Sequence, residues 1–433
     1  MNSENNKFNG WKILAVLWLL FFNMSLVMYG GSVLNAYMAR SLEMARDSFG
    51  GGISLSYLIM GLSSPLVAVL VHKIDVRRVL VMGMLVQALG GLILGTMVRD
   101  AFGFAIGYGV IMGFGVSIGG ILPMQTTVAN WFERKRSLAT AIFLSAGGMS
   151  GFLGSYLFSY LIDETALTWQ SIWLGMMTFS VILSLLAYLV IRETPGELGQ
   201  KPDGVQSKDD LKALQAGKTL HIFQTAEVWT LKKALFKPVF WYLNLGLLGM
   251  AVTYEVCAAT GVIHLMDTGI NNQLASFSVG LLSLSSVIGR LTAGFFADRI
   301  EPRYILAFGS TLIAVGTFLI VQPAAQFMIL LYAMLTGFGH GLCFVCAFAL
   351  LANYFGPRLL PSILGITMPF ILTSSALGIY LTGRNQVNSG NYQQAFVIVA
   401  LVAAGAAFFA FIAAPVGKGI QQIKAVSQPV SGE

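Results

Sequence analysis

Charge is scarce in this sequence: only 10% of its 433 residues are Asp, Glu, Lys or Arg, whereas soluble domains carry about 25%. Hydrophobic residues make up 56% of the chain, which excludes a soluble globular protein. Cysteine is rarer still: Cys257, Cys343 and Cys346 all lie in apolar runs, so neither a disulfide framework nor a metal site is expected. The nucleotide-binding P-loop pattern and any nucleophile–base arrangement are also lacking. We therefore expect a membrane protein that is not an enzyme and needs no cofactor.

The apolar runs are long enough to cross a membrane as helices, which takes about 20 residues each. Six runs precede a polar stretch from Arg192 to Lys237, and six follow it. They begin near Trp11, Phe49, Arg78, Phe102, Ser137, Trp169, Val239, Asn272, Tyr304, Phe327, Leu359 and Gln394. We predict an all-α membrane protein with about 12 transmembrane helices in two pseudo-symmetric six-helix bundles. The expected divisions are an N-terminal bundle over 1–191, a central cytoplasmic loop with a surface helix over 192–237, a C-terminal bundle over 238–416 and a cytoplasmic tail over 417–433.

The net charge of +7 comes from lysines and arginines in short loops between the apolar runs. Every second loop is rich in them, as at Arg134–Arg136 and Lys232–Lys237, and the loops between are poor in them. Basic loops face the cytoplasm, so orientation in the bilayer explains the charge better than a nucleic-acid partner does. We expect a multi-pass protein of the inner or plasma membrane with both termini in the cytoplasm.

The central loop contains two candidate helices. Residues His221 to Phe240 place apolar side chains at roughly helical spacing beside lysines, which suits a helix lying on the membrane surface. Lys208 to Gln215 fits either a short surface helix or a solvated linker.

The two halves of the sequence resemble each other. Asn130-Trp131-Phe132 opens the fifth run and Asn353-Tyr354-Phe355 opens the eleventh. The loop His72–Arg77 after the second run aligns with Asp298–Arg303 after the eighth. Two landmarks at nearly the same offset indicate two six-span halves in one orientation, an arrangement whose binding site lies between the halves.

The pattern Gly294-x-x-x-Asp298-Arg299-x-x-x-Arg303 resembles the cytoplasmic loop motif of the major facilitator superfamily. The copy of this motif in the first half differs from the family pattern, because His72 occupies the position of the usual Asp and Asp75 that of a Gly. These differences put in doubt the strength of the cytoplasmic latch that the first-half motif would form. The resemblance covers essentially the whole chain. It implies a secondary transporter that works by alternating access.

A narrower resemblance is to the monocarboxylate porter and oxalate–formate antiporter branch. It is carried by Asn9-Gly10-Trp11, by Trp131–Ala139 and by Trp229–Leu235 followed by Phe240-Trp241, although Ala141 stands where the branch has a Gly. In that branch an arginine of the eighth span binds the carboxylate, and Arg290 occupies the matching place. Oxalate exchangers use a lysine of the eleventh span, and residues 359–382 contain none, which favours a mono-anion.

The resemblance also implies that the first, fourth, seventh and tenth helices line the transport cavity. Candidates for its wall are Asn23, Tyr29, Gln125, Tyr254 and Phe344.

Three ionisable residues lie inside apolar runs, where they usually face a bundle interior or a watery cavity. Arg290 lies about eight residues before Asp298, roughly 12 Å along the helix, and could bind a carboxylate or be structural. Glu255 could carry a proton, form part of an outer gate or bond to a neighbouring backbone or hydroxyl group. A height difference of roughly 12 Å argues against its direct contact with Arg290. His340, flanked by glycines, could exchange protons or be a satisfied interior histidine.

The loop charges suggest a cytoplasmic gate rather than chemistry. Asp298, Arg299 and Arg303 are expected to bond across to the other half when the cytoplasmic side is shut, with Lys73 and Arg77 as the first-half counterparts.

The leading hypothesis is proton-coupled transport of a small organic anion, a monocarboxylate, in which the partners are the anion, protons and the lipid bilayer. The alternatives are anion exchange, efflux of drugs or amphiphiles, and a transporter-like receptor. The sequence leaves the exact substrate, the direction of transport and the oligomeric state open.

Overall fold

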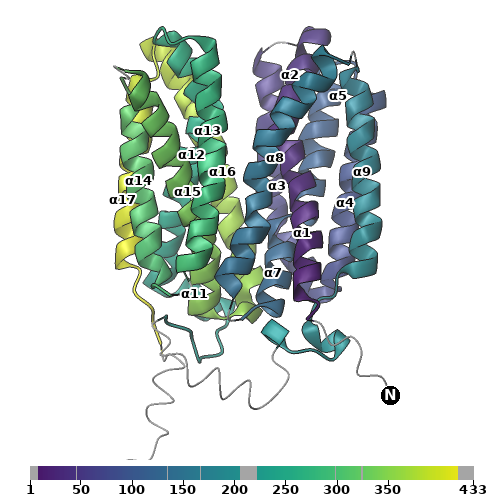
Figure 1. Cartoon of the computed structure of the whole chain (residues 1–433), viewed down its shortest axis with the longest axis vertical. Coiled ribbons are helices and arrows are strands. Elements are labelled where there is room, and N and C mark those ends of the chain that lie inside the picture. The colour runs from purple at the N-terminus through teal and green to yellow at the C-terminus, as the bar shows by residue number, and fades with distance from the viewer. Residues whose placement is uncertain are drawn as a thin grey trace, which may run out of the picture.

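The computed structural model describes residues 8–44, 46–133, 135–165, 167–204, 222–297, 299–322 and 325–417. Within these ranges twelve helical spans are long and apolar enough to cross a membrane. They form two six-span bundles side by side, one from each half of the chain (Figure 1). The predicted fold class is therefore confirmed.

Two of the six spans of the first half are built from several helical segments. The first span comprises α1 (Gly10–Ser25), the π-helical turn η1 (Leu26–Gly30) and α2 (Gly31–Ser41). The fourth comprises α5 (Ala101–Phe104), the π-helical η2 (Ala105–Met112), α6 (Gly113–Ile118) and α7 (Ile121–Trp131). The other four are α3 (Arg46–Lys73), α4 (Val76–Thr96), α8 (Arg136–Asp163) and α9 (Trp169–Val190).

Each span of the second half is one continuous helix. The six are α12 (Pro238–Asp267), α13 (Asn272–Phe296), α14 (Pro302–Leu319), α15 (Gln326–Phe355), α16 (Leu360–Ser389) and α17 (Gln393–Ile412). All twelve spans begin within three residues of the predicted positions.

Short polar side chains fix where several helices begin. Asp75 accepts a hydrogen bond from the backbone N of Arg77 at 2.8 Å, and Asn271 accepts one from Leu274 at 2.8 Å. These caps satisfy backbone donors that have no partner within the first turn of a helix. The polar turns between spans are thus also the start signals of the next helix.

The loop before α12 differs from the prediction. The surface helix expected from His221 to Phe240 is wrong over Ile222–Thr230, and only α11 (Leu231–Leu235) forms a separate helix there. Backbone bonds to the second bundle replace helical ones, because Thr225 N donates to Asn353 O at 2.9 Å and Phe223 N donates to Glu301 Oε2 at 3.2 Å. The segment Lys208–Gln215 lies outside the described residues.

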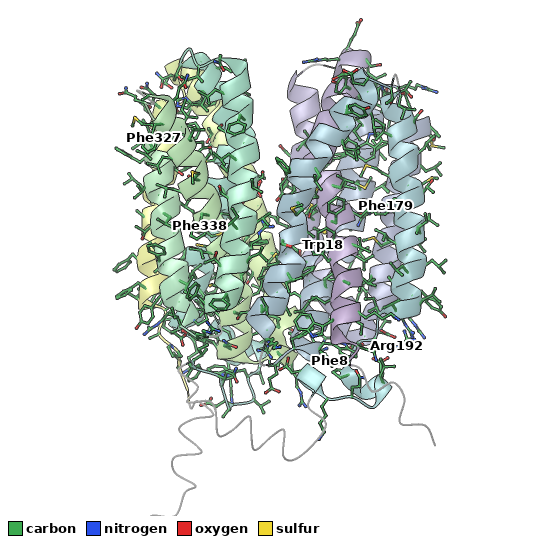
Figure 2. The ribbon with its side chains drawn as sticks, viewed as in Figure 1. Phe8, Trp18, Phe179, Arg192, Phe327 and Phe338 are labelled. Atoms are coloured by element: carbon green, nitrogen blue, oxygen red, sulfur yellow. The ribbon has the colours of Figure 1, made fainter. Side chains whose placement is uncertain are left out.

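The bundles meet through two helix pairs, α8 with α13 and α3 with α16. Gly294 of α13 packs against α8 near Leu138, and Gly365 of α16 packs against Ala68 of α3. These contacts lie toward the end of the molecule that carries the basic loops. The described chain also begins and ends at that end, and the ribbons separate toward the opposite end (Figure 1). Phe327 lies on the outer surface of the second bundle, whereas Phe179 packs against the core of the first (Figure 2).

Candidate functional site

A cavity of about 110 Å³ lies between the two bundles, roughly midway along the spans. This volume is well above the minimum for a single water molecule and leaves room for a small organic solute. Its first-half wall comes from α1, η1, α3, α7 and α8, and its second-half wall from α12, α13, α15 and α16. Most of the wall is apolar, so the few polar groups in it determine what can bind.

Arg290 brings a buried positive charge to this cavity from α13. Its side chain is 4% exposed, and its Nη1 donates to the backbone carbonyl of Leu144 on α8. The guanidinium carbon lies 5.2 Å from the ring centre of Phe344, and Nε has no hydrogen-bond partner. Among the described residues the only ion pair joins Asp75 and Arg77, so no described carboxylate forms an ion pair with Arg290.

Two glycines of α8 make room for this guanidinium. A Cβ atom on Gly147 would lie 3.1 Å from Arg290 Nη1 and 3.0 Å from Phe21 Cε1. A Cβ atom on Gly148 would lie 3.2 Å from the carbonyl oxygen of Ser283 on α13. The close approach of α8 and α13 that carries Arg290 into the cavity thus depends on the absence of side chains at this pair.

Glu255 brings a carboxyl group to the same cavity from α12. It lies beside Tyr57 of α3, so the two groups approach each other from opposite bundles. The described residues show no ion pair between Glu255 and Arg290, although the two charges are close enough to interact. A base and a fixed cation therefore share one chamber and remain separate.

His340 of α15 is held on several sides. Its Nδ1 is 3.1 Å from Ser286 Oγ, and its ring stacks on Tyr254 with centres 3.6 Å apart and an interplanar angle of 11°. Phe344 lies on α15 with its ring centre 5.3 Å from that of His340. In the described part of the chain Nε2 has no hydrogen-bond partner, and the residue lines the cavity. The ring is thus fixed in orientation with one nitrogen available.

The structure brings most of the predicted site residues together. Arg290, Glu255, His340, Tyr29 and Phe344 all line the cavity. Tyr29 lies in the π-helical turn η1, a feature often found at functional sites. Tyr254 does not line the cavity; it packs behind His340.

Besides Tyr254, two more of the predicted wall residues, Asn23 and Gln125, do not line the cavity. Asn23 points into the first bundle, where its Nδ2 donates to Ser180 Oγ at 3.0 Å and to Gln87 Oε1 at 3.3 Å. Gln125 is fully buried, and its Nε2 donates to Thr140 Oγ1 at 2.9 Å. Both amides satisfy their donors inside the first bundle, so neither contributes to the cavity wall.

Three polar residues of the cavity wall, on α3 and α16, were not predicted from the sequence. Tyr57 was missed because α3 was not expected to line the cavity. Thr367 and Ser375 of α16 also line it, and their hydroxyl oxygens are buried with no hydrogen-bond partner among the described residues. Isolated hydroxyl residues are common in apolar spans, so no signal in the sequence singled them out.

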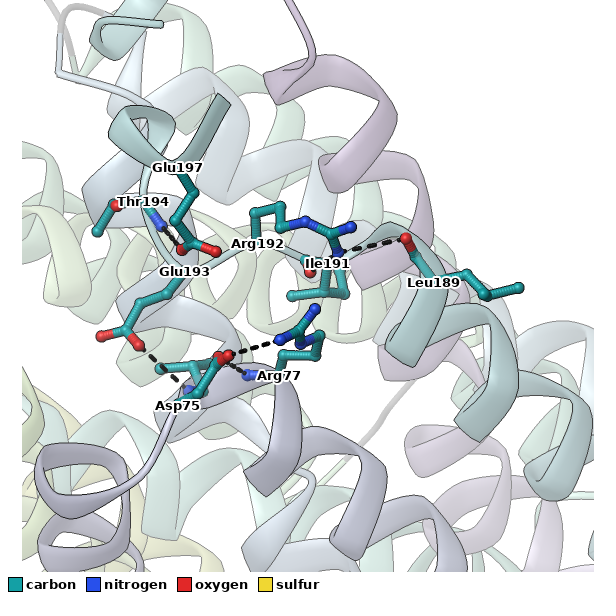
Figure 3. Close-up of polar contacts among 9 residues, drawn as sticks. Asp75, Arg77, Leu189, Ile191, Arg192, Glu193, Thr194 and Glu197 are labelled. Carbon is teal, nitrogen blue, oxygen red and sulfur yellow. Dashed lines mark hydrogen bonds and ion pairs between the residues drawn. The ribbon is translucent and has the colours of Figure 1, made fainter. Parts of the chain in front are cut away.

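The predicted gate residues lie at the basic end but contact their own halves. Arg77 pairs with Asp75 at 3.1 Å (Figure 3), Arg299 stacks over Phe295 at 3.8 Å, and Arg303 Nη2 donates to Tyr304 Oη at 2.8 Å. Lys73 is exposed at the end of α3, and Asp298 lies outside the described residues. In this conformation the expected bonds of Arg299 and Arg303 to the other half are therefore not made among the described residues.

Other contacts cross between the halves at this end. His72 Nε2 lies 2.9 Å from Ser362 Oγ, and Arg136 Nη1 donates to Asn353 Oδ1 at 3.4 Å. Close to His72, Glu193 accepts a hydrogen bond from Val76 N at 3.3 Å (Figure 3). Burial raises the pKa of Glu193, and that backbone hydrogen bond opposes the rise. The contacts between the halves at this end are thus hydrogen bonds in which at most one partner is charged.

Comparison with known proteins places the chain among transporters. The profile described as "Major Facilitator Superfamily" matches residues 16–266 and 257–430. Monocarboxylate transporter 13 of Rattus norvegicus is 24% identical over 406 residues, which cover 90% of this chain and 86% of that protein. The aspyridones efflux protein apdF of Emericella nidulans is 24% identical over 286 residues, which cover 65% of this chain and 52% of that protein. The match thus spans about half the length of this and similar fungal relatives.

Solved structures share the fold. The proton:xylose symporter XylE superposes with a TM-score of 0.75 at 13% identity and covers 98% of this chain and 100% of its own. The human organic anion transporter MFSD10 superposes with a TM-score of 0.68 at 16% identity, covering 93% of this chain and 99% of its own. At these identities the likeness concerns the fold alone.

Proposed function

Because the chain belongs to the Major Facilitator Superfamily, we propose that it is a secondary transporter that carries a small monocarboxylate together with a proton. The two bundles would rock around the central cavity and expose it alternately to either side of the membrane, as transporters with two like halves do. Arg290 would bind the carboxylate, and Glu255 would take up the proton.

The observation that carries this proposal is the unneutralised guanidinium of Arg290 in the cavity. A buried charge is costly unless it is paired, and no described carboxylate pairs with it. A substrate anion would supply the missing charge. Guanidinium groups hold carboxylates through two parallel hydrogen bonds and remain protonated at physiological pH.

The charges in the cavity support the proposed proton coupling. With Glu255 ionised, the chamber already holds one negative charge near Arg290, and this competes with an incoming anion. Protonation of Glu255 removes that competitor, so anion and proton load together. The loaded cavity then carries a neutral set of charges, which lowers the cost of closing apolar walls around it.

The basic end of the molecule is taken as the cytoplasmic end. The loops there hold most of the lysines and arginines, and both ends of the described chain lie on that side. On this assignment the bundles are closed toward the cytoplasm and separated toward the outside, which supports the proposal of an outward-facing state. The proposed location is the inner or plasma membrane.

Efflux of an apolar compound is the second candidate. Adaptable side chains favour varied apolar ligands, and the fungal relatives include an efflux protein. Five methionines line the cavity: Met24, Met28, Met60, Met250 and Met368. The small cavity and the guanidinium without an ion-pair partner favour the anion, and transport measurements separate the two candidates.

The test uses purified protein in liposomes with a pH-sensitive dye trapped inside. Lactate, pyruvate, formate or acetate is added to the outside of the liposomes. The interior should then acidify more than the leak of free acid through the lipid alone would cause. Arg290→Ala should lower the protein-dependent rate at least about tenfold, which corresponds to about 1.4 kcal/mol of lost binding or transition-state free energy. Arg99→Ala, which changes an exposed arginine outside the cavity, is the matched control.

The outcome decides between the candidates. If no acid gives a protein-dependent signal, proton–monocarboxylate symport is excluded. Exchange would then be measured with acids on both sides of the membrane. Uptake of a lipophilic cation that survives Arg290→Ala would favour efflux.

A further inference from the structure

A second cavity of about 570 Å³ lies outside the central one, among α12, α16 and α17. It shares no lining residue with the central cavity. Leu248 and Val252 of α12 form its floor, and α16 and α17 form its sides. This second cavity, the α16–α17 groove, is therefore a separate feature of the second bundle.

The groove opens toward the surroundings of the protein. Helix α16 uses a different face to contact α3, where Gly61 packs near Leu372. The groove residues Leu377, Leu381 and Ile398 are 53%, 52% and 56% exposed. Large apolar side chains at such exposure in a membrane span face hydrocarbon. Lipid chains are thus the molecules in contact with this groove.

The groove has the length of one lipid leaflet. Its residues on α16 run from Ser374 to Asn388, which is about 21 Å along a helix. Half of a hydrocarbon core is about 15 Å thick. The deep end, beside Leu248 and Val402, is apolar apart from the hydroxyl group of Ser374, whereas Arg384, Asn385 and Asn388 surround the end away from the basic loops. An apolar channel therefore leads to a polar rim at headgroup level.

Arg384 gives this rim a positive charge. Its Nη1 donates to Tyr380 Oη at 3.2 Å, and no described carboxylate forms an ion pair with it. Loops at this end of the protein contain few basic residues, so Arg384 does not belong to the set that orients the chain. Arginine binds phosphate oxygens through its fork of donors, and the two asparagines add donors beside it.

We propose that the α16–α17 groove is a binding site for an anionic phospholipid of the leaflet opposite the basic loops. One acyl chain occupies the apolar channel, and Arg384 with Asn385 and Asn388 binds the headgroup. A Cβ atom on Gly378 would lie 2.8 Å from Val252 Cγ1, so this glycine lets α16 approach α12 and form the floor of the channel. The site is independent of the substrate and of the direction of transport.

The test is native mass spectrometry of the full chain released from bilayers with equal parts of phosphatidylglycerol and phosphatidylcholine. Wild-type protein should retain phosphatidylglycerol in preference to phosphatidylcholine. Arg384→Gln should lower that preference about threefold or more, because the headgroup loses its charged partner. Arg99→Gln removes an exposed arginine at the same end of the other bundle and should leave the preference unchanged.

A second variant separates the acyl chain from the headgroup. Ser374→Phe fills the deep end of the groove and should reduce retention of both lipids at this site, whereas Arg384→Gln should change only their ratio. Added inorganic phosphate should displace no lipid, which distinguishes a lipid site from a free-phosphate site. Equal lipid ratios in wild type, Arg384→Gln and Arg99→Gln would overturn the proposal, as would unchanged retention in Ser374→Phe.

Discussion

At the level of single residues, Arg290 and Glu255 have opposite charges in one cavity and form no ion pair in the described structure. A permanent bond between them would neutralise the site and leave little reason for an anion to enter. Under the proposed function, their separation would leave the arginine available to a carboxylate and the glutamate available to a proton. Tyr57 lies beside Glu255 on the opposite bundle, so the proposed proton site lies at the boundary between the two halves.

Glu255→Gln should uncouple proton movement from anion movement. The amide cannot take up a proton, so acid-driven acidification in liposomes should fall at least about tenfold. Exchange of labelled for unlabelled monocarboxylate should persist, because Arg290 still binds the anion. The pH dye and the isotope measure the two movements separately. Glu164→Gln alters an exposed carboxyl group at the outer end of α8 and is the control; proton uptake that survives in Glu255→Gln would place the coupling group elsewhere.

The sequence predicted charged site residues better than neutral ones. Arg290 and Glu255 could be found because a charge in an apolar span must have a partner or a polar cavity. Asn23 and Gln125 could not be assigned in the same way, because an uncharged amide can donate its hydrogen bonds to neighbours within one bundle, as both do here. The rotation of a helix about its axis decides between these cases, and it depends on packing between helices distant in the sequence.

At the level of helices, α8 and α13 position Arg290 through a close approach at Gly147 and Gly148. Gly147→Ala would place a methyl group 3.1 Å from Arg290 Nη1. We expect the guanidinium to shift by a few tenths of an ångström and the KM for the transported acid to rise about fivefold, or about 1 kcal/mol. Gly280→Ala in α13 adds its methyl group in open space and should leave KM unchanged. Equal kinetics in the two variants would show that the glycine does not position the arginine.

The same level shows which elements could be predicted. The twelve spans begin within three residues of the predicted positions because apolar length and polar turns are local properties. The segment before α12 could not be predicted, because the bonds from Thr225 to Asn353 and from Phe223 to Glu301 are tertiary. The helical spacing of apolar residues in Ile222–Thr230 therefore predicted a helix, but this segment instead forms contacts with the second bundle.

At the level of the whole molecule, the repeated landmarks predicted two like bundles with a site between them, and the fold agrees. The end at which the bundles close could not be predicted. The loop charges suggested a latch of ion pairs, whereas His72–Ser362 and Arg136–Asn353 are the described polar contacts that cross at the basic end. Because these contacts involve few charges, the strength of the latch depends on helix packing beside them.

Alternating access requires this end to open, which a crosslink across the His72–Ser362 contact should prevent. In a His72→Cys, Ser362→Cys variant, a short thiol-reactive crosslinker should join the halves, since the native side chains are 2.9 Å apart. The three native cysteines are buried and should react little. Exchange of labelled monocarboxylate in liposomes should fall at least about tenfold and recover when a cleavable linker is reduced, while either single variant treated alike should stay active. Full exchange by the crosslinked protein would contradict rocking of the bundles at this end, because no substrate could then pass by the proposed route.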